Sequence, residues 1–336
     1  MGEFDLIERY FKVPARAMRN NGSVALGIGD DCALLQPAAG MQLAISSDML
    51  VEGRHFFADV DPGALGHKAL AVNLSDLAAC GAKPLAFTLA LSLPQTHANE
   101  DWLSPFSRGL LALAAEHNCV LIGGDTTQGP LNICITVFGE VPKNMALLRS
   151  GAKAGDDIYV SGTLGDARLA LEAMRGNVTL TEQAFTTARK RLESPTPRVT
   201  LGIALRGIAS SAIDVSDGLL GDLGHILKQS QVGAVIDTSI AMKLIANKAI
   251  NTLDKTQLLP QYTSQKQLQY VFSGGDDYEL AFTAPASQRN AVQAAAVASN
   301  TPVTRIGQIE AALGLRLIDD QGKPVKNSFE SWDHFQ

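Results

Sequence analysis

Charged residues are scarce in this chain. They make up 18% of its 336 residues, whereas hydrophobic residues make up 46%; an average soluble protein has about 25% charged residues. So much apolar sequence excludes a disordered chain, and at roughly 150 residues per domain the length predicts about two domains. Lys and Arg number 28 and Asp and Glu 34, so the net charge is −6, and no basic block interrupts this balance. We therefore expect no nucleic-acid partner, because such a protein presents a basic face to the phosphates.

The chain also lacks the signs of disulfides, zinc fingers, export and membrane insertion. Its cysteines are Cys32, Cys80, Cys119 and Cys134, and none of them forms a CxxC pair. Three of the four lie in apolar runs, and isolated cysteines of this kind fit a reducing compartment. The N-terminal sequence MGEFDLIERYF is acidic where a signal peptide is basic, and no apolar run approaches 18 residues. These absences predict a cytoplasmic protein with no membrane partner.

Familiar nucleotide-binding and hydrolase motifs are missing as well. The chain has no GxxxxGK[ST], no HRD with DFG, no GxSxG and no HExxH. The nearest approach to GxGxxG is Gly27–Cys32, which has no third glycine. P-loop enzymes, protein kinases, serine hydrolases and zinc proteases therefore find little support.

Strand and helix patterns alternate along both halves of the chain. Strands are predicted at residues 42–50, 86–93, 132–141, 157–162 and 211–216, and at the shorter segments 233–237, 269–274, 279–284 and 305–310. Helices are predicted at residues 67–82, 99–117, 165–176, 181–194, 217–230, 239–249 and 285–299, with a further helix that starts near 198. The Pro- and Gly-containing segment 142–156 is a predicted connector. We expect an α/β (α+β) fold with two domains, 1–150 and 151–336.

The aspartates stand in unusual surroundings. Most lie among Gly, Ser and Thr and against an apolar segment, rather than on a polar helix face. These aspartates are Asp30 and Asp31 (GIGDDCALL), Asp48 (SSDM), Asp76 (NLSDLA), Asp125 (IGGDTT), Asp214 and Asp217 (IDVSDG), and Asp276 and Asp277 (SGGDDYEL). A single such aspartate is more often a helix cap or a turn residue, and this explanation suits Asp217 and Asp222 best. Its repetition in separate segments indicates a shared site.

Magnesium and phosphates explain such a set. Several partly buried carboxylates cannot all stay ionised without compensating charge. Mg²⁺ takes oxygen ligands and usually combines one or two carboxylates with waters and substrate phosphates. Glycines let backbone N–H groups approach phosphate oxygens. The pattern therefore predicts a nucleotide site with several magnesium ions.

The motifs resemble those of a known family. GIGDDCALL (27–35), ISSDMLVEGRHF (45–56), HKALAVNLSDLAACGAKP (67–84), LIGGDTT (121–127), RSGAKAGD (149–156), IDVSDGLLGDLGHI (213–226) and SGGDDYELAFT (273–283) look like bacterial thiamine-monophosphate kinases. The resemblance runs in order over nearly the whole chain. That family belongs to the ATP-binding superfamily of aminoimidazole-ribonucleotide synthetase and selenophosphate synthetase. The resemblance implies two α/β domains, with the N-terminal domains of a homodimer pairing through a β-barrel.

The resemblance also implies a reaction and its residues. The reaction is transfer of the ATP γ-phosphoryl group to thiamine monophosphate, giving thiamine diphosphate, the last step in the formation of that cofactor. The implied magnesium ligands are Asp31, Ser46, Ser47, Asp48, Asp76, Asp125, Asp214 and Asp217. The implied ATP contacts are Gly124, Asp125, Arg149 and Ser216. The implied contacts to thiamine monophosphate are His55, Asp276 and Trp332.

Two positions depart from the commonest form of the family pattern, and the reaction needs no catalytic side chain. Asp276 stands where Glu is common, one methylene longer, and Trp332 stands where Tyr is also seen. The acceptor is a phosphate monoester that is already ionised near neutral pH, so a general base is unnecessary for direct in-line transfer. Several Mg²⁺ ions would lower the repulsion between the anionic donor and the anionic acceptor.

Other functions stay open on the sequence. Selenophosphate synthetase is disfavoured because no cysteine lies in the first 31 residues. An ATP-dependent ligase similar to aminoimidazole-ribonucleotide synthetase is the strongest sister alternative. A two-metal phosphohydrolase is the alternative from another class, and a nucleotide-sensing module without turnover is a third.

Overall fold

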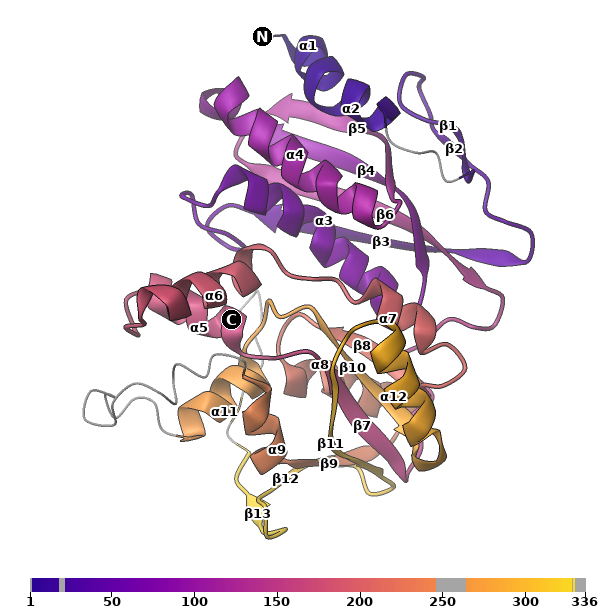
Figure 1. Cartoon of the computed structure of the whole chain (residues 1–336), viewed down its shortest axis with the longest axis vertical. Coiled ribbons are helices and arrows are strands. Elements are labelled where there is room, and N and C mark those ends of the chain that lie inside the picture. Colours follow the sequence, from indigo (N-terminus) through magenta and orange to yellow (C-terminus); the bar gives the residue numbers. More distant parts are fainter. Residues whose placement is uncertain (1, 18–21, 246–263, 328, 330–336) are drawn as a thin grey trace. The chain divides into compact units, whose positions relative to one another are not determined.

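The structure, a computed structural model of the chain, describes residues 2–17, 22–245, 264–327 and 329. It divides into two compact units, Met1–Leu77 with Ala82–Ala146 and Ala78–Gly81 with Leu147–Gln336 (Figure 1). Both units mix helices and strands, which confirms the expected fold class; the domain boundary at residue 150 stays a prediction. Among the described residues, no helix is long and apolar enough to cross a membrane.

The described part of the first unit begins with helical segments and continues with alternating strands and helices. In chain order its elements are α1 (Glu3–Ile7), the π-helical turn η1 (Glu8–Lys12), α2 (Val13–Ala17), β1 (Val24–Leu26), β2 (Leu34–Leu35), β3 (Met41–Val51), α3 (Pro62–Ala79), β4 (Lys83–Leu93), η2 (Gln95–His97), α4 (Glu100–Glu116), β5 (Val120–Gln128) and β6 (Asn132–Pro142). The strands predicted at residues 42–50, 86–93 and 132–141 are thus confirmed as β3, β4 and β6.

Four of these strands form one sheet with the order β3-β6-β4-β5. Strands β4 and β5 run parallel, and β6 pairs antiparallel with both β3 and β4. Figure 1 shows α3 and α4 crossing one face of this sheet. The leucines at helical spacing in α3 and the apolar residues predicted for α4 are buried: Leu70, Leu74, Leu77, Leu103, Phe106, Leu110 and Leu113.

Strand β3 exposes apolar side chains on alternate residues. Leu43, Ile45 and Met49 are 43%, 60% and 52% exposed. Because side chains alternate along a strand, these three lie on the same face. β3 is also at the edge of the sheet, so it has one side without a neighbouring strand in the described part of the unit.

The second unit is built on a larger sheet. In chain order its described elements are β7 (Asp156–Ser161), α5 (Asp166–Met174), α6 (Glu182–Glu193), α7 (Val199–Ala204), β8 (Ser211–Val215), α8 (Leu219–Ser230), β9 (Gly233–Asp237), α9 (Thr238–Ala241), η3 (Met242–Leu244), α11 (Ser264–Ser273), β10 (Glu279–Pro285), η5 (Ala286–Gln288), α12 (Arg289–Ala298), β11 (Val303–Glu310), β12 (Gly314–Ile318) and β13 (Pro324–Val325). The sheet order is β13-β12-β9-β11-β7-β10-β8, and its pairings are antiparallel except that of β9 with β12.

The strand predicted at residues 269–274 is wrong. Residues 269–273 belong to α11, whose Leu268, Val271 and Phe272 are buried in the core of the unit. Their spacing of three and four residues places them on one face of a helix. The run of Tyr, Val and Phe suggested a strand because β-branched and aromatic residues favour strands in general, and the burial of one helical face outweighs that preference here. Of the helix predicted at 239–249, α9 and η3 cover residues 239–244, and residues 246–249 lie outside the described residues.

Candidate active site

In the first unit, β3 and α3 bring three of the predicted residues together. The Ser46 hydroxyl donates a hydrogen bond to the Asp76 carboxylate on α3. The Asp48 backbone N–H donates to Asn73 Oδ1, one helical turn before Asp76, over 3.1 Å. Ser46 and Asp48 are two residues apart, so both side chains lie on the face of β3 that faces α3. This arrangement forms an oxygen-rich site from Ser46, Asp48 and Asp76.

Asn73 is a member of this site that sequence reasoning missed. It is 1% exposed, and its amide nitrogen donates to Ala69 O over 3.0 Å. That bond orients the amide oxygen toward the backbone N–H of Asp48. The sequence did hold a signal for Asn73: it precedes Asp76 by three residues, and residues three apart in a helix lie on the same face.

Ser47 points the other way. Its hydroxyl lies 3.0 Å from Thr136 Oγ1 and 3.2 Å from Ile135 O, both on β6. Its side chain therefore follows the exposed face of the sheet with Ile45 and Met49, and does not join Asp76. A metal-binding role for Ser47 stays a prediction.

A pocket of about 260 Å³ in the first unit gathers three further predicted residues. Asp31 lines it from the GIGDD loop, and Gly124 and Asp125 line it from β5. Both carboxylates belong to exposed residues, and the remaining lining includes apolar residues of the N-terminal helical segment, β4 and β5. The pocket therefore combines acidic groups at an open surface with an apolar wall.

Local backbone geometry explains the glycine and the paired aspartates of this pocket. Gly124 has φ of +145°, and a Cβ there would overlap the main-chain oxygen of Leu89 on the adjacent strand. Only glycine therefore lets β4 and β5 approach at this point. Asp30 Oδ1 accepts a hydrogen bond from the backbone N–H of Asp31 over 2.9 Å. Asp30 therefore shapes the turn that presents Asp31.

His55 lies in the turn after β3, and its ring has a defined orientation. Its Nδ1 accepts a hydrogen bond from the backbone N–H of Val51 over 3.0 Å. A neutral ring then carries its proton on Nε2. The buried Lys68 donates to the main-chain oxygen of His55 over 3.2 Å and so fixes the turn from α3.

In the second unit, the loop between β8 and α8 carries Ser216 and Asp217. The backbone N–H groups of both residues donate to Asp222 Oδ2, over 3.0 and 3.1 Å. Burial raises the pKa of Asp222 to about 7, against the effect of these N–H groups. The carboxylate that holds the start of α8 is therefore that of Asp222, while Gly218 is the N-cap residue. Asp214 is 6% exposed at the end of β8, beside this loop.

Backbone hydrogen bonds join the loop that carries Asp276 to the loop between β8 and α8. Asp276 N–H donates to Ser216 O and Tyr278 N–H donates to Val215 O, each over 2.9 Å. Asp276 and Tyr278 have φ of 65° and 52°, which side chains other than glycine rarely adopt. A Cβ at Gly275 would overlap Ser216 O, so the glycine allows the two loops to touch. Asp276 thus lies close to Ser216 within this unit.

Comparison with known proteins decides the family. The models of the AIR synthase related protein N-terminal and C-terminal domains match residues 29–141 and 153–320. The thiamine-monophosphate kinases of Salmonella typhimurium and Escherichia coli K12 are 46% and 47% identical to this chain, covering 99% of it and 98% of each relative. This chain belongs to the thiamine-monophosphate kinase family.

Solved structures agree with this assignment. The thiamine-monophosphate kinase of Stenotrophomonas maltophilia K279a superposes with a TM-score of 0.82 at 45% identity, covering 97% of this chain and 98% of that chain. A structure described as AaThiL complexed with AMPPCP and TMP has a TM-score of 0.75 at 27% identity, covering 99% and 97%. The hydrogenase maturation protein HypE, at 20% identity and a TM-score of 0.74, shares the fold.

Two residues expected from the family motifs stand apart from these clusters. Ser230 Oγ donates to the main-chain oxygen of Arg149 over 3.3 Å, at the end of α8. The twelve residues of α8 span roughly 18 Å, so the Arg149 backbone lies far along that helix from Ser216. Its role at ATP stays a prediction. Trp332 lies outside the described residues.

The carboxylates occur as small sets rather than as one cluster. Among the described residues, no group of three or more His, Cys, Asp or Glu could hold a metal ion. Pairs of carboxylates with a serine hydroxyl nearby fit the chemistry of Mg²⁺, which completes its shell with waters and phosphate oxygens. The donors are oxygens throughout, as a hard cation requires.

Proposed function

We propose that this chain transfers the γ-phosphoryl group of ATP to thiamine monophosphate, giving thiamine diphosphate and ADP. The observation that carries the proposal is the 46–47% identity, over nearly the full length, to relatives named thiamine-monophosphate kinase. The related structure with AMPPCP and TMP supports the same pair of substrates. The reaction would be the last step in the formation of thiamine diphosphate.

The chemistry asks the protein for positioning and charge compensation. The acceptor oxygen belongs to a phosphate monoester, which is ionised near neutral pH and needs no general base. In-line transfer then depends on holding donor and acceptor oxygens in place. Mg²⁺, when bound, would neutralise charge on the phosphate oxygens. We assign no side chain as a catalytic acid or base.

We assign the metal and ATP roles by unit. In the first unit, Ser46, Asp48 and Asp76 would hold Mg²⁺ beside α3, and Asp31 and Asp125 would hold it at the pocket, with Gly124 against the nucleotide. Ser47 is also a proposed ligand, but its hydroxyl lies on the other face of β3 and would not share an ion with Asp76. In the second unit, Asp214 and Asp217 would hold further ions, with Ser216 and Arg149 at ATP. The support is the oxygen-only donor set and the pocket that Asp31, Gly124 and Asp125 share.

Thiamine monophosphate would contact His55, Asp276 and Trp332. The ring of His55 is oriented by Val51 and leaves Nε2 as the protonated nitrogen. The Asp276 side chain is shorter than the Glu common in the family, so the loop that carries it must supply the reach. Trp332 would stack on a ring of the substrate, since indole is the best aromatic face for a cation such as thiazolium.

We also propose a homodimer in which the sheets of the first units pair as a barrel. The apolar residues Leu43, Ile45 and Met49 on the exposed face of β3 support it. An edge strand with exposed apolar residues is a surface that a soluble protein usually covers. A cytoplasmic location, consistent with four free cysteines, is part of the same proposal.

The test is the reaction itself with two acceptors. Purified protein with Mg-ATP should convert thiamine monophosphate to the diphosphate and should leave free thiamine almost unreacted, because its hydroxyl would need deprotonation. Phosphate release from ATP without any diphosphate product would instead favour a phosphohydrolase. Efficient pyrophosphorylation of free thiamine would contradict the proposal.

A further inference from the structure

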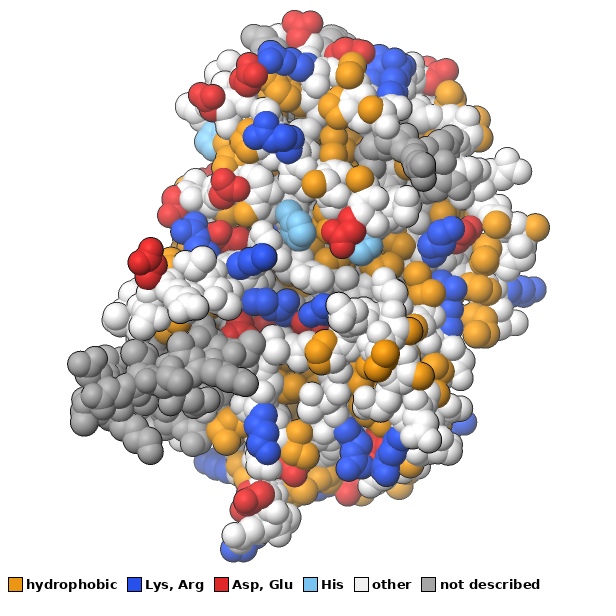
Figure 2. All heavy atoms as spheres, in the orientation of Figure 1, with side chains coloured by type: hydrophobic (Ala, Val, Ile, Leu, Met, Phe, Trp, Pro, Cys, Tyr) orange, Lys and Arg blue, Asp and Glu red, His pale blue; other side chains and the backbone are white. Residues whose placement is uncertain are grey.

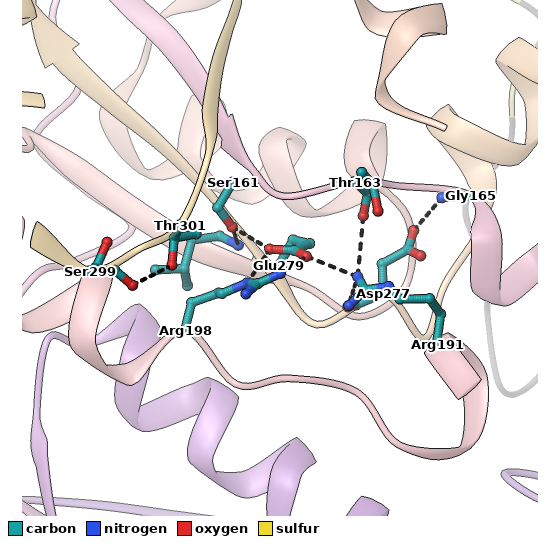
Figure 3. A network of polar contacts seen from close by, with 10 residues as sticks. Ser161, Thr163, Gly165, Arg191, Arg198, Asp277, Glu279, Ser299 and Thr301 are labelled. Atoms are coloured by element: carbon teal, nitrogen blue, oxygen red, sulfur yellow. Dashed lines mark hydrogen bonds and ion pairs between the residues drawn. The ribbon is translucent and has the colours of Figure 1, made fainter. Parts of the chain in front are cut away.

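A network of buried polar side chains includes Asp277 and Glu279, which follow Asp276 in the chain (Figure 3). Glu279, the first residue of β10, is fully buried. Its carboxylate accepts hydrogen bonds from Arg198 Nε over 2.6 Å, from Arg191 Nη2 over 2.9 Å and from the Ser161 hydroxyl over 2.5 Å. One carboxylate therefore holds two guanidinium groups, from α6 and from the N-terminal end of α7, and a hydroxyl from β7.

Arg191 has contacts that a simple ion pair would not need. Besides Glu279, its Nη2 donates to the main-chain oxygen of Thr163 over 3.3 Å and to that of Asp277 over 3.2 Å. Asp277 immediately follows Asp276. A single guanidinium on α6 thus ties together the segment after β7, the loop after α11 and the start of β10, as Figure 3 shows.

The side chain of Asp277 adds a second tie between the same segments. It is fully buried, and its Oδ2 accepts a hydrogen bond from the backbone N–H of Gly165 over 2.8 Å. Gly165 is the N-cap residue of α5 and has φ of +87°. The loop around residues 274–278 is therefore held from one side by α5 and α6 and from the other by its bonds to Val215 and Ser216.

This loop needs such support because its backbone is strained. Asp276 and Tyr278 both lie in the left-handed region, with φ of 65° and 52°. Residues with a Cβ occupy that region only where surrounding contacts determine the conformation. Loss of a contact on the main chain beside Asp276 would therefore release the loop toward ordinary backbone angles and move the Asp276 carboxylate.

We propose that Arg191 is a positioning residue for the phosphoryl transfer. Its contacts to Thr163 O, Asp277 O and Glu279 hold residues 274–278 in the conformation that presents Asp276 to thiamine monophosphate. This inference rests on the proposed function, which places Asp276 at the substrate. Lysine replaces Arg191 poorly, because its ammonium nitrogen lies one bond nearer to Cα than Nη2, the single nitrogen that makes all three of these contacts.

The experiment compares Arg191→Lys with Arg189→Lys. Arg189 lies two residues earlier on α6 and pairs over 2.9 Å with Glu193, four residues further along the same helix. We measure the Kd of thiamine monophosphate by calorimetric titration of the full chain, together with a thermal melt. Arg191→Lys should weaken binding about tenfold or more. Arg189→Lys should bind within about twofold of wild type, because the ion pair of Arg189 with Glu193 lies within α6 itself.

A double-mutant cycle separates positioning from plain stability. If Arg191 acts through Asp276, Arg191→Lys should add little to the loss already caused by Asp276→Ala. If Arg191→Lys does not fold, Glu279→Gln, which keeps the shape of the side chain, replaces it in the cycle. Equal binding by wild type and the variant, or a full additional loss in the Asp276→Ala background, would overturn the inference. A wild-type chain that does not bind thiamine monophosphate would contradict the proposed function instead.

Discussion

At the scale of single residues, the site depends on carboxylates that the backbone and neighbouring side chains hold in place. Asp76 accepts from Ser46, and Asp222 accepts from the N–H groups of Ser216 and Asp217. The surroundings of the aspartates in the sequence indicated this chemistry, since Gly and Ser neighbours place them at strand ends and turns. The particular partners were not predictable, because Ser46 and Asp76 are thirty residues apart and meet only when β3 packs on α3.

The first residue-scale prediction concerns Asp76. Asp76→Asn should reduce turnover by about two orders of magnitude or more, because it removes a charged oxygen ligand from the proposed magnesium site. The fold should survive, since an amide still accepts a hydrogen bond from Ser46. Steady-state rates at several Mg²⁺ concentrations and a thermal melt check both points. Asp59→Asn, at an exposed position of the same unit, is the control and should behave as wild type. Near-normal turnover of the Asp76 variant at low Mg²⁺ would count against the assignment.

The second residue-scale prediction concerns Asp277 and pH. Burial raises the pKa of Asp277 well above its ordinary value, and the Asp166 and Glu279 carboxylates act in the same direction, whereas Arg191 and the N–H of Gly165 oppose it. The folded chain therefore keeps this proton at pH values where the unfolded chain, with a pKa of about 3.9, has lost it. Because the folded chain then binds more protons than the unfolded chain, Asp277 lowers the free energy of unfolding as pH rises from the unfolded pKa toward the raised pKa of the folded chain.

Asp277→Asn cannot titrate, so the variant should lose less stability than wild type as pH rises. Urea unfolding at pH 4.5, 5.5 and 7 gives the comparison. The difference in free energy of unfolding between variant and wild type should shift steadily in favour of the variant over this range. A difference that stays constant with pH would show that Asp277 ionises normally in the folded chain.

At the scale of elements, the geometry of the site depends on close contacts between backbone segments as well as on side chains. Gly124 lets β5 run against β4 beside the pocket, and Gly275 lets the Asp276 loop touch the loop after β8. The sequence predicted β3, β4 and β6 and both helices that pack on them, because their apolar periodicities are clear. It failed at α11, where an aromatic run concealed a helical face.

Gly124→Ala tests the element-scale argument. The added Cβ overlaps Leu89 O, and the residue keeps a positive φ that alanine disfavours. We expect the free energy of unfolding to fall by about 2 kcal/mol or more, with loss of turnover. Gly224→Ala, inside α8 with nothing near its Cβ, is the control and should gain about 0.5–1 kcal/mol. Chemical unfolding of both variants decides; equal stability of Gly124→Ala and wild type would contradict the steric argument.

At the scale of the whole molecule, composition gives only general expectations. Low charge and the absence of a basic block predict that nucleic acid is not a partner. On the face shown in Figure 2, lysine and arginine side chains are scattered among acidic and apolar ones. The buried contacts of Arg191 and Glu279 could not be foreseen, because they join residues that lie 88 positions apart in the sequence.

The proposed homodimer makes a prediction at this scale. Light scattering after size exclusion should give a dimer for wild type at micromolar concentration. Ile45→Glu places a charge on the exposed face of β3 and should yield a monomer, whereas Val297→Glu, at an 81% exposed position of the second unit, should remain dimeric. A monomeric wild type, or a dimer that Ile45→Glu leaves intact, would contradict the assigned interface.

The proposed reaction transfers a phosphoryl group to a phosphate, and separation of its products is its most direct test. The chain is incubated with Mg-ATP and thiamine monophosphate, and nucleotides and thiamine phosphates are separated by chromatography. We expect thiamine diphosphate and ADP in equal amounts, with free inorganic phosphate at background. ADP and inorganic phosphate without thiamine diphosphate would contradict it.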